Sequence, residues 1–598
     1  MARLESPYEN VKMGVNYVGD AACATCHAEI AASYRKHPMG RSLSSAAALP
    51  GHDAGDAPVG QVFQAAGFEY SITSRDGRVY DRETRRDAQG RAVVSVEAVV
   101  SYILGSGTRG RSFLSESDGY LVQSPISWYS QEGRWGLAPG FDQMNSHFER
   151  PIDPACLSCH SNRVEPAGDA VNRYLPPTFR GESIGCERCH GPGELHVKAP
   201  RMLNGIDVTI VNPRRLDLTL RDSVCEQCHL QGDHRIERAG ATLRDFRPGL
   251  PLGEFLAVYH RTDNRSTTNR AVGHVEQMRD SRCFRETQGT LGCISCHDPH
   301  RTPEPAERVA YFRDRCLACH GPNRTGCSIA EPERRARSKD DSCIQCHMPV
   351  LKNTDIVHNA TTNHRIARNP AVEEPSRNPT GASASQNGAP LELFHPGKTD
   401  PDSRRAALRD LGVALVHEGE TRRSEAERAS FGQMATKLLT TAVKDDPDDQ
   451  LARGVLGEAL LLDDRQTAAL AAIQEALVQA PKGELLLDRA SLIALNKNRW
   501  ELAADYTRRV IAVNPRRADY HQRLGHILLQ QREWRPSAAA SREALRLDPS
   551  LDVARMNLIT CELKLKEDRL ARADLEILQV FDPSKADLLR HLFEPTAK

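Results

Sequence analysis

The pentapeptide Cys186-Glu-Arg-Cys189-His190 is one of seven Cys-x-x-Cys-His motifs in this 598-residue chain. In such a motif the two thiols can attach a porphyrin through its vinyl groups, and the following histidine can ligate the iron from the proximal side. Structural zinc sites also use Cys-x-x-Cys pairs, but they need no histidine directly after every second cysteine. The sequence therefore predicts seven covalently bound haem c groups and argues against zinc.

The attachment residues follow from the motifs and account for 14 of the 17 cysteines. The predicted thioether cysteines are Cys23, Cys26, Cys156, Cys159, Cys186, Cys189, Cys225, Cys228, Cys293, Cys296, Cys316, Cys319, Cys343 and Cys346. The predicted proximal iron ligands are His27, His160, His190, His229, His297, His320 and His347. Of the remaining cysteines, Cys283 and Cys327 are expected either to form a disulfide or to stay unpaired, and Cys561 to fill a helical core.

The sixth coordination position of each iron decides what such a protein does, because a filled position favours electron transfer and an open one allows chemistry. Ten histidines outside the motifs precede the predicted linker, namely His37, His52, His147, His196, His234, His260, His274, His300, His358 and His364. They are enough to fill all seven positions, and no Cys-x-x-Cys-Lys variant of the motif occurs. Both facts favour electron transfer over catalysis.

A different pattern begins after the last haem motif. Five prolines recur at intervals of 34 residues, which is the period of a tetratricopeptide (TPR) helix pair: Pro447, Pro481, Pro515, Pro549 and Pro583. Small residues recur in the same register, as in Leu456-Gly457 and Leu524-Gly525. The pattern predicts an α-solenoid of stacked helix pairs with a concave face, for docking a partner or for assembly.

The predicted fold is mainly α with a small β insert, in which a multihaem domain of little regular structure precedes the solenoid. Alternating runs such as Phe68–Ile72, separated by turn signals, predict antiparallel strands in the long gap between the first two motifs. The predicted domains are an N-terminal segment with the first motif (1–57), a haem-free β insert (58–150), a six-haem array (151–367), a linker rich in Pro, Ser and Gly (368–404) and the TPR domain (405–598).

Four segments carry a resemblance to a known family: Tyr17-Val-Gly-Asp20, Gly185-Cys-Glu-Arg-Cys-His-Gly-Pro-Gly-Glu-Leu-His196, Cys296-His-Asp-Pro-His300 and His358-Asn-Ala-Thr-Thr-Asn-His364. Over residues 17–366 the chain resembles the tetrahaem cytochromes of ammonia oxidisers and the wider hydroxylamine-oxidoreductase superfamily, including members fused to TPR domains. The resemblance implies distal iron ligands at His147, His196, His274, His300, His358 and His364, with His37 or Met39 serving the first haem. His52, His234 and His260 are then expected at the surface or against haem propionates.

Composition limits the partners and the location. Lysine plus arginine equals aspartate plus glutamate at 79 each, so no net charge favours nucleic acid or an anionic membrane. No apolar run is long enough to predict a membrane span. Haem attachment takes place outside the bacterial cytoplasmic membrane, so we expect a periplasmic or extracellular protein. Residues 1–8 show no apolar signal-peptide region, which we attribute to a start assigned too far downstream or to a mature form.

Three functions are compatible with these features. Seven haems between residues 23 and 347 must lie close together, which predicts a heptahaem electron carrier whose redox partner protein docks on the TPR domain. The alternative is a multihaem oxidoreductase that acts on a small nitrogen or sulfur compound at one open-site haem, as some members of the superfamily do. A bare scaffold has no need of seven redox centres, so the sequence favours the electron carrier.

Overall fold

The computed structural model describes residues 6–46, 58–168, 170–262, 270, 272–321, 327–353, 356, 360–368, 390–395 and 401–593. The chain divides into two compact units, each assembled from three stretches of sequence. The motif unit comprises Met1–Leu43, Ser158–Arg163 and Phe179–Glu418, and the repeat unit comprises Ser44–Leu157, Val164–Thr178 and Gly419–Lys598. Most of the predicted linker (368–404) lies outside the described residues.

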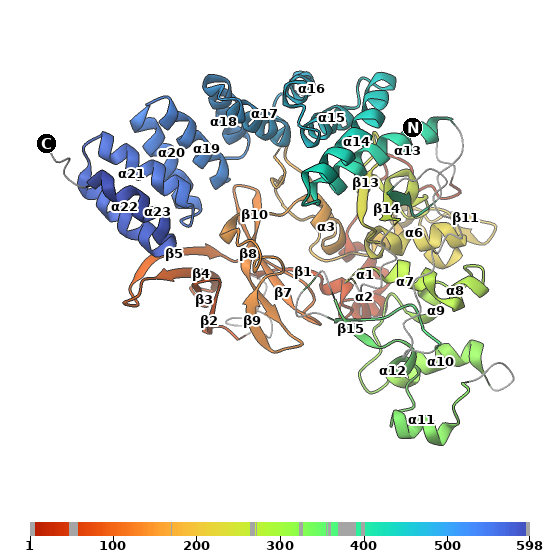
Figure 1. Ribbon diagram of the computed structural model, residues 1–598. Helices are drawn as coiled ribbons and strands as arrows, with labels where there is room; N and C mark the ends of the chain where they lie inside the picture. The colour runs from red at the N-terminus through yellow and green to blue at the C-terminus, as the bar shows by residue number, and fades with distance from the viewer. Residues whose placement is uncertain are drawn as a thin grey trace. The chain divides into compact units, whose positions relative to one another are not determined.

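Paired helices of regular length form the C-terminal part of the repeat unit (Figure 1). The first helices of successive pairs begin at Gln450, Glu484, Ala518 and Asp552, at intervals of 34 residues. These helices are α14 (Glu425–Asp445), α15 (Gln450–Leu462), α16 (Gln466–Gln479), α17 (Glu484–Asn496), α18 (Trp500–Val513), α19 (Ala518–Gln530), α20 (Trp534–Leu547), α21 (Asp552–Lys564), α22 (Asp568–Phe581) and α23 (Pro583–Arg590). The helix before them, α13 (Pro401–Glu420), belongs to the motif unit as far as Glu418. The predicted helical repeat of 34 residues is confirmed.

Small residues let these helices pack closely, as the sequence register predicts. A Cβ atom added at Gly457 of α15 would lie 2.5 Å from Ile473 of α16, and one at Gly525 of α19 would lie 2.6 Å from Ser541 of α20. At such distances the neighbouring side chain would have to shift, because protein interiors are close-packed. Cys561 is fully buried in α21 and its thiol contacts the Ser537 hydroxyl, so the prediction of a core cysteine is confirmed.

Two antiparallel sheets fill the first part of the repeat unit (Figure 1). One sheet has the order β2-β3-β4-β5, formed by β2 (Val62–Ala65), β3 (Phe68–Arg75), β4 (Arg78–Arg86) and β5 (Ala92–Val99). The other has the order β1-β6-β7-β8-β10 with β9 on β8, formed by β1 (Leu43–Ser45), β6 (Tyr102–Leu104), β7 (Arg111–Ser117), β8 (Tyr120–Tyr129), β9 (Arg134–Leu137) and β10 (Arg150–Pro151). Alternate side chains of both sheets, Tyr70 and Phe113 among them, share one hydrophobic core.

The two sheets pack on the junctions between successive helical repeats, although the sequence separates them by hundreds of residues. The contacts run from one junction to the next: Val171 N donates to Glu484 (2.8 Å), Tyr120 Oη donates to the Val513 carbonyl (2.7 Å), Ala518 N donates to Glu149 (3.0 Å), and Arg85 donates to the Val580 carbonyl (3.1 Å). The β part and the helical repeats therefore form one compact unit, which the sequence did not indicate.

Short helices separated by loops make up the motif unit, together with three small sheets. The helices are α1 (Asp20–Cys26), α2 (Ala28–Tyr34), α3 (Pro154–His160), α4 (Glu187–His190), α5 (Glu194–Lys198), α6 (Leu218–His229), α7 (His274–Asp280), α8 (Arg282–Glu286), α9 (Cys293–Cys296), α10 (Arg308–His320), α11 (Glu331–Arg337) and α12 (Cys343–His347). The sheets pair β11 (Met202–Leu203) with β12 (Ile206–Asp207), order β13 (His234–Glu237), β14 (Leu256–Arg261) and β17 (Leu391–Leu393), and pair β15 (Val350–Lys352) with β16 (Ala360–Thr362).

The hydrophobic core of the motif unit lies around the sheet β13-β14-β17. It joins Tyr8 near the N-terminus to Leu230, Phe255 and Phe394, so segments far apart in the sequence share one cluster. The predicted fold class, mainly helical with small sheets, is confirmed. Among the described residues, no helix is both long and apolar enough to cross a bilayer.

Candidate haem sites

Each Cys-x-x-Cys-His motif contains a short helical segment. In α4 and α12, for example, the helical turn brings the two cysteines onto one face and carries the histidine at its end. All the motif cysteines are free thiols, with no disulfide between them. Six motifs lie entirely in the motif unit, and the second is divided, with Cys156 in the repeat unit and His160 in the motif unit. Thiols and imidazole are therefore presented in the form that covalent haem attachment requires.

Two proximal histidines are oriented by hydrogen bonds from their Nδ1 atoms. His190 Nδ1 lies 2.8 Å from the Val211 carbonyl oxygen, and His347 Nδ1 lies 2.9 Å from that of Ala367. A carbonyl oxygen can only accept, so Nδ1 carries the proton and Nε2 is left with a lone pair for a metal. Histidine ligands are commonly oriented in this way.

Three motif histidines face a second histidine with their rings nearly parallel. The ring centroids of His27 and His196 lie 6.4 Å apart with 12° between the planes, and those of His190 and His300 lie 5.9 Å apart with 9°. His297 and His364 form the third pair, at 6.2 Å and 26°. A metal–imidazole bond is about 2 Å long, so a metal between two facing rings separates their centroids by about 6 Å. The three pairs therefore fit an iron with two axial histidines.

A fourth pair has perpendicular rings. The centroids of His229 and His274 lie 5.4 Å apart at 85°, and His274 also meets His364 edge-on at 4.9 Å. The pair His229–His274 and the pair His297–His364 are therefore neighbours. Facing pairs occur at four of the seven motifs in the part of the chain that the structure describes, and each second histidine belongs to the predicted distal set.

Burial keeps several of these imidazoles neutral, which is the form that ligates a metal. Removal from water lowers the pKa of His160, His190 and His229, and it lowers the pKa of His297 to about 4. A neutral imidazole needs no deprotonation before it binds iron. The motif histidines are thus suited to their predicted role.

Cysteines of different motifs lie next to each other in four pairs. A hydrogen bond with Cys186 lowers the pKa of the Cys23 thiol, and similar contacts join Cys159 to Cys228, Cys225 to Cys293, and Cys316 to Cys343. The first motif therefore adjoins the third, the second adjoins the fourth, the fourth adjoins the fifth, and the sixth adjoins the seventh. Porphyrins attached at these positions would lie close enough to exchange electrons.

Two carboxylates hold the first and third motifs together in a reciprocal arrangement. Glu187, the second residue of the third motif, accepts hydrogen bonds from Val18 N (2.9 Å), Gly19 N (2.8 Å) and Gly193 N (2.8 Å). Asp20, at the start of α1, accepts one from Cys186 N (2.9 Å). Only 3% of the Glu187 surface is exposed, so these bonds are shielded from water. We call this arrangement the carboxylate clamp.

A second glutamate, Glu226, occupies the same place in the fourth motif. It is buried, and its carboxylate meets Arg279 of α7 at 2.5 Å and His395 at 2.9 Å. Glu276, also on α7, accepts hydrogen bonds from Gln231 N (2.9 Å) and Gly232 N (2.8 Å). Helix α7 is therefore fixed on both sides of His229, which positions His274 at its first residue.

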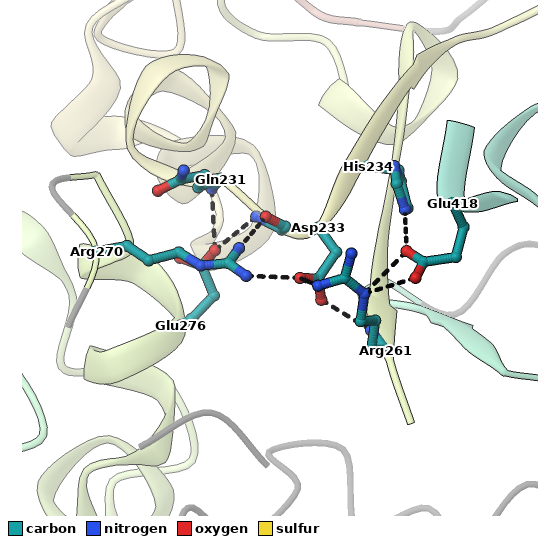
Figure 2. A network of polar contacts seen from close by, with 8 residues as sticks. Gln231, Asp233, His234, Arg261, Arg270, Glu276 and Glu418 are labelled. Atoms are coloured by element: carbon teal, nitrogen blue, oxygen red, sulfur yellow. Dashed lines mark hydrogen bonds and ion pairs between the residues drawn. The ribbon is translucent and has the colours of Figure 1, made fainter. Parts of the chain in front are cut away.

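Figure 2 shows how the chain after the fourth motif is anchored. Asp233 contacts Arg270 at 2.6 Å and accepts a hydrogen bond from Arg261 N at 2.8 Å. The Arg261 side chain binds Glu418 of α13 at 2.8 Å, and Glu418 also meets His234 at 2.6 Å (Figure 2). The network ties the sheet β13-β14-β17 to the fourth motif on one side and to α13 on the other.

Several predicted site residues lie elsewhere. His147 belongs to the repeat unit, where its Nδ1 lies 2.6 Å from Glu83 and its Nε2 lies 2.9 Å from Ser550 Oγ. Both ring nitrogens are thus engaged, which disfavours the predicted iron ligation. His37, proposed with Met39 for the first haem, stacks on Tyr34 at 5.8 Å, and Met39 lies in the short 3₁₀ helix Met39–Arg41.

The outcomes for the remaining predicted residues differ from one to the next. His234 is buried against Glu418 and not at the surface, and burial lowers the pKa of His260 to about 4. The predicted ligand His358 and also His52 lie outside the described residues. Cys283 and Cys327 are both free thiols, so the structure contains no disulfide between them.

Sequence reasoning did not identify the residues that hold the motifs in place. Asp20, Glu187, Glu226 and Glu276 all bind segments distant in the sequence. A partial signal was present, because the third and fourth motifs both carry glutamate directly after their first cysteine. Their partners depend on tertiary folding and leave no local pattern.

The comparisons with known proteins concern two parts of the chain. Residues 140–191 match the family model described as cytochrome c554 and c-prime, and residues 287–326 match the model of the doubled CXXCH motif. These matches cover the second, third, fifth and sixth motifs and identify segments of a multihaem c-type cytochrome with covalently bound haem c. A search of curated proteins finds no match.

Solved structures of MamA also resemble part of the chain. A MamA structure from AMB-1 is 18% identical, with 31% of this chain and 94% of that chain covered and a TM-score of 0.28. One from MSR-1 is 18% identical, with 32% and 99% covered and a TM-score of 0.26. MamA from residue 41 onward, from Desulfovibrio magneticus RS-1, is 18% identical, with 30% and 96% covered and a TM-score of 0.26.

Proposed function

We propose that this protein is a heptahaem c-type cytochrome that transfers electrons between closely packed haems. The observation that carries the proposal is the set of four histidine pairs, in which a motif histidine faces a second histidine across 5.4–6.4 Å. Two axial histidines fill the coordination sphere of a haem iron, which leaves no position for a substrate. Such sites are suited to accepting and passing on single electrons.

The residues of this chain have three tasks in that function. Fourteen cysteines hold the porphyrins, which supply one-electron chemistry at iron when bound. The motif histidines bind the iron from one side, and we assign His196, His300, His274 and His364 to the other side of the first, third, fourth and fifth haems. This assignment places His196, and not His37 or Met39, at the first haem.

The contacts between motifs indicate which haems would be neighbours. Cysteine contacts link the first motif to the third, the second to the fourth, the fourth to the fifth and the sixth to the seventh. The carboxylate clamp would fix the distance between the first and third haems, on which the rate of electron exchange depends. Electrons would then pass between neighbouring haems within three groups: the first and third, the second, fourth and fifth, and the sixth and seventh.

The helical repeats are of the TPR type by period and register, and we infer that they bind a redox partner protein or mediate assembly. The β part occupies the repeat junctions at Glu484, Val513 and Ser550, so a partner would use another face of the solenoid. A periplasmic or extracellular location, and a relationship to the tetrahaem cytochromes of ammonia oxidisers, are part of the same proposal.

Mass spectrometry and coulometry of the purified holoprotein test this function together. We expect a mass increase of seven haems and a reversible uptake of seven electrons per chain. A variant with Cys316 and Cys319 changed to Ala should contain one haem fewer and take up one electron fewer per chain. If electron uptake is irreversible, or if the number of electrons falls well short of the number of haems, the role as an electron carrier is contradicted.

A further inference from the structure

The Nδ1 atom of His196 has a partner of a different kind from those of three other histidines at the predicted haem sites. In His190, His347 and His364 the Nδ1 atom lies 2.8–2.9 Å from a backbone carbonyl oxygen. In His196 it lies 2.8 Å from a carboxylate oxygen of Asp207. A carbonyl is neutral and a carboxylate carries a full charge, so the two partners have different effects on the imidazole.

The fold holds the Asp207 carboxylate in this position. Asp207 lies in β12, paired with Met202 in the small hairpin β11-β12. Its Oδ1 accepts hydrogen bonds from the backbone N (2.9 Å) and the hydroxyl of Thr209, which leaves Oδ2 for His196. The carboxylate is thus oriented toward His196.

A carboxylate that accepts the N–H of an imidazole ligand makes that ligand a stronger electron donor to the metal. Stronger donation stabilises ferric over ferrous iron, and hydrogen bonding in the outer shell is one of the means by which proteins set haem potentials.

We propose that Asp207 is a positioning residue that lowers the reduction potential of the haem attached at Cys23 and Cys26, through its bond to His196. The inference rests on the proposed function, since it requires His27 and His196 to be the axial pair of that haem. It makes the first haem harder to reduce than it would be with a neutral partner on His196. In the haem that adjoins it, at Cys186 and Cys189, His190 is oriented by a carbonyl, and Nδ1 of the assigned second ligand His300 lies 3.7 Å from the Asp298 carboxylate, farther than the 2.8 Å between His196 and Asp207.

The substitution Asp207→Asn separates charge from geometry. Asparagine has nearly the same shape and its side-chain oxygen can still accept the His196 N–H, so the ring stays oriented while the charge is lost. Asp207→Ala removes both. Glu194→Gln is the matched control, because Glu194 is a carboxylate on the same helix as His196 but binds Asn16 and Lys198.

The test is a spectroelectrochemical titration of the holoprotein, combined with electron paramagnetic resonance (EPR) of its oxidised form. In Asp207→Asn we expect one of the seven one-electron steps to move to higher potential, by a change of about tenfold in its reduction equilibrium, which is about 59 mV. One low-spin EPR signal should shift with it, while the other six steps stay in place. Glu194→Gln should change neither.

The outcomes separate this inference from the proposed function. If wild-type protein takes up electrons reversibly and no step moves in Asp207→Asn, or if Glu194→Gln moves the same step equally, the role of Asp207 is refuted and the electron carrier stands. If wild-type protein is not reduced reversibly, the proposed function fails and the inference fails with it. If the spectrum changes in Asp207→Ala but not in Asp207→Asn, Asp207 only orients His196. The proposal that its charge lowers the reduction potential is then refuted.

Discussion

The carboxylate clamp predicts that Glu187 makes a large contribution to the stability of the motif unit. Glu187 accepts three backbone hydrogen bonds, from Val18, Gly19 and Gly193, while only 3% exposed. A hydrogen bond to a charged group contributes about 1.5–3 kcal/mol, and the contributions in one cluster are not additive. We therefore expect Glu187→Ala to lower the free energy of unfolding by roughly 4 kcal/mol. Glu187→Gln, which retains one acceptor oxygen, should cost about half as much.

Urea unfolding of the holoprotein, followed by the Soret band, measures this contribution. The matched control is Glu182→Gln, because Glu182 precedes the same motif but is exposed, and it should change the free energy of unfolding by less than about 0.5 kcal/mol. The clamp also predicts weaker magnetic coupling between the first and third haems in Glu187→Gln. If the free energy of unfolding of Glu187→Gln lies within about 0.5 kcal/mol of the wild-type value, the three hydrogen bonds do not make the expected contribution to stability.

Further predictions concern other buried groups. His147 is 2% exposed and bonded to Glu83 and Ser550, so His147→Ala should destabilise the repeat unit by roughly 3 kcal/mol in thermal unfolding and leave the haem spectrum unchanged. A new high-spin band would instead restore His147 as an iron ligand. Burial lowers the pKa of His260 to about 4, so the unfolded chain binds a proton near pH 6.5 that the folded chain binds only near pH 4. The contribution of neutral His260 to the free energy of unfolding is fully present above pH 6.5 and decreases by roughly 3 kcal/mol as the pH drops to 4. In urea titrations at each pH, His260→Gln should remove this part of the pH dependence. An unchanged pH profile in His260→Gln would refute the assignment.

The features that could be predicted from the sequence are those that a local pattern determines. A haem motif needs two thiols and an imidazole at fixed spacing, so seven candidate sites were visible in the sequence. The helical repeat needs one small residue at each close contact, so its register could also be read, and Gly457 and Gly525 lie where the helices touch. Resemblance added His196, His274, His300 and His364, each of which faces a motif histidine.

The features that could not be predicted depend on contacts between distant segments. Nothing in residues 58–150 indicates that these strands pack on repeat junctions more than 300 residues away, so the contacts of His147 with Glu83 and Ser550 could not be predicted. His37 precedes Met39 near the first motif, but proximity in sequence does not bring it to His27, which faces His196 instead. Asp207 binds His196, 11 residues away, and Glu187 binds Val18 and Gly19, at least 168 residues away, besides the nearby Gly193. The sequence marks Glu187 only by its place after the first cysteine of the motif.

The proposed electron transfer requires haem irons with two histidine ligands, and EPR of the oxidised holoprotein tests this directly. The four histidine pairs predict low-spin ferric signals that stay unchanged when cyanide, nitrite or hydroxylamine is added. The perpendicular pair His229–His274 should give a more anisotropic signal than the nearly parallel pairs His27–His196 and His190–His300. A high-spin signal that shifts on adding any of these ligands would reveal an open iron, and the protein would then have to be regarded as an oxidoreductase.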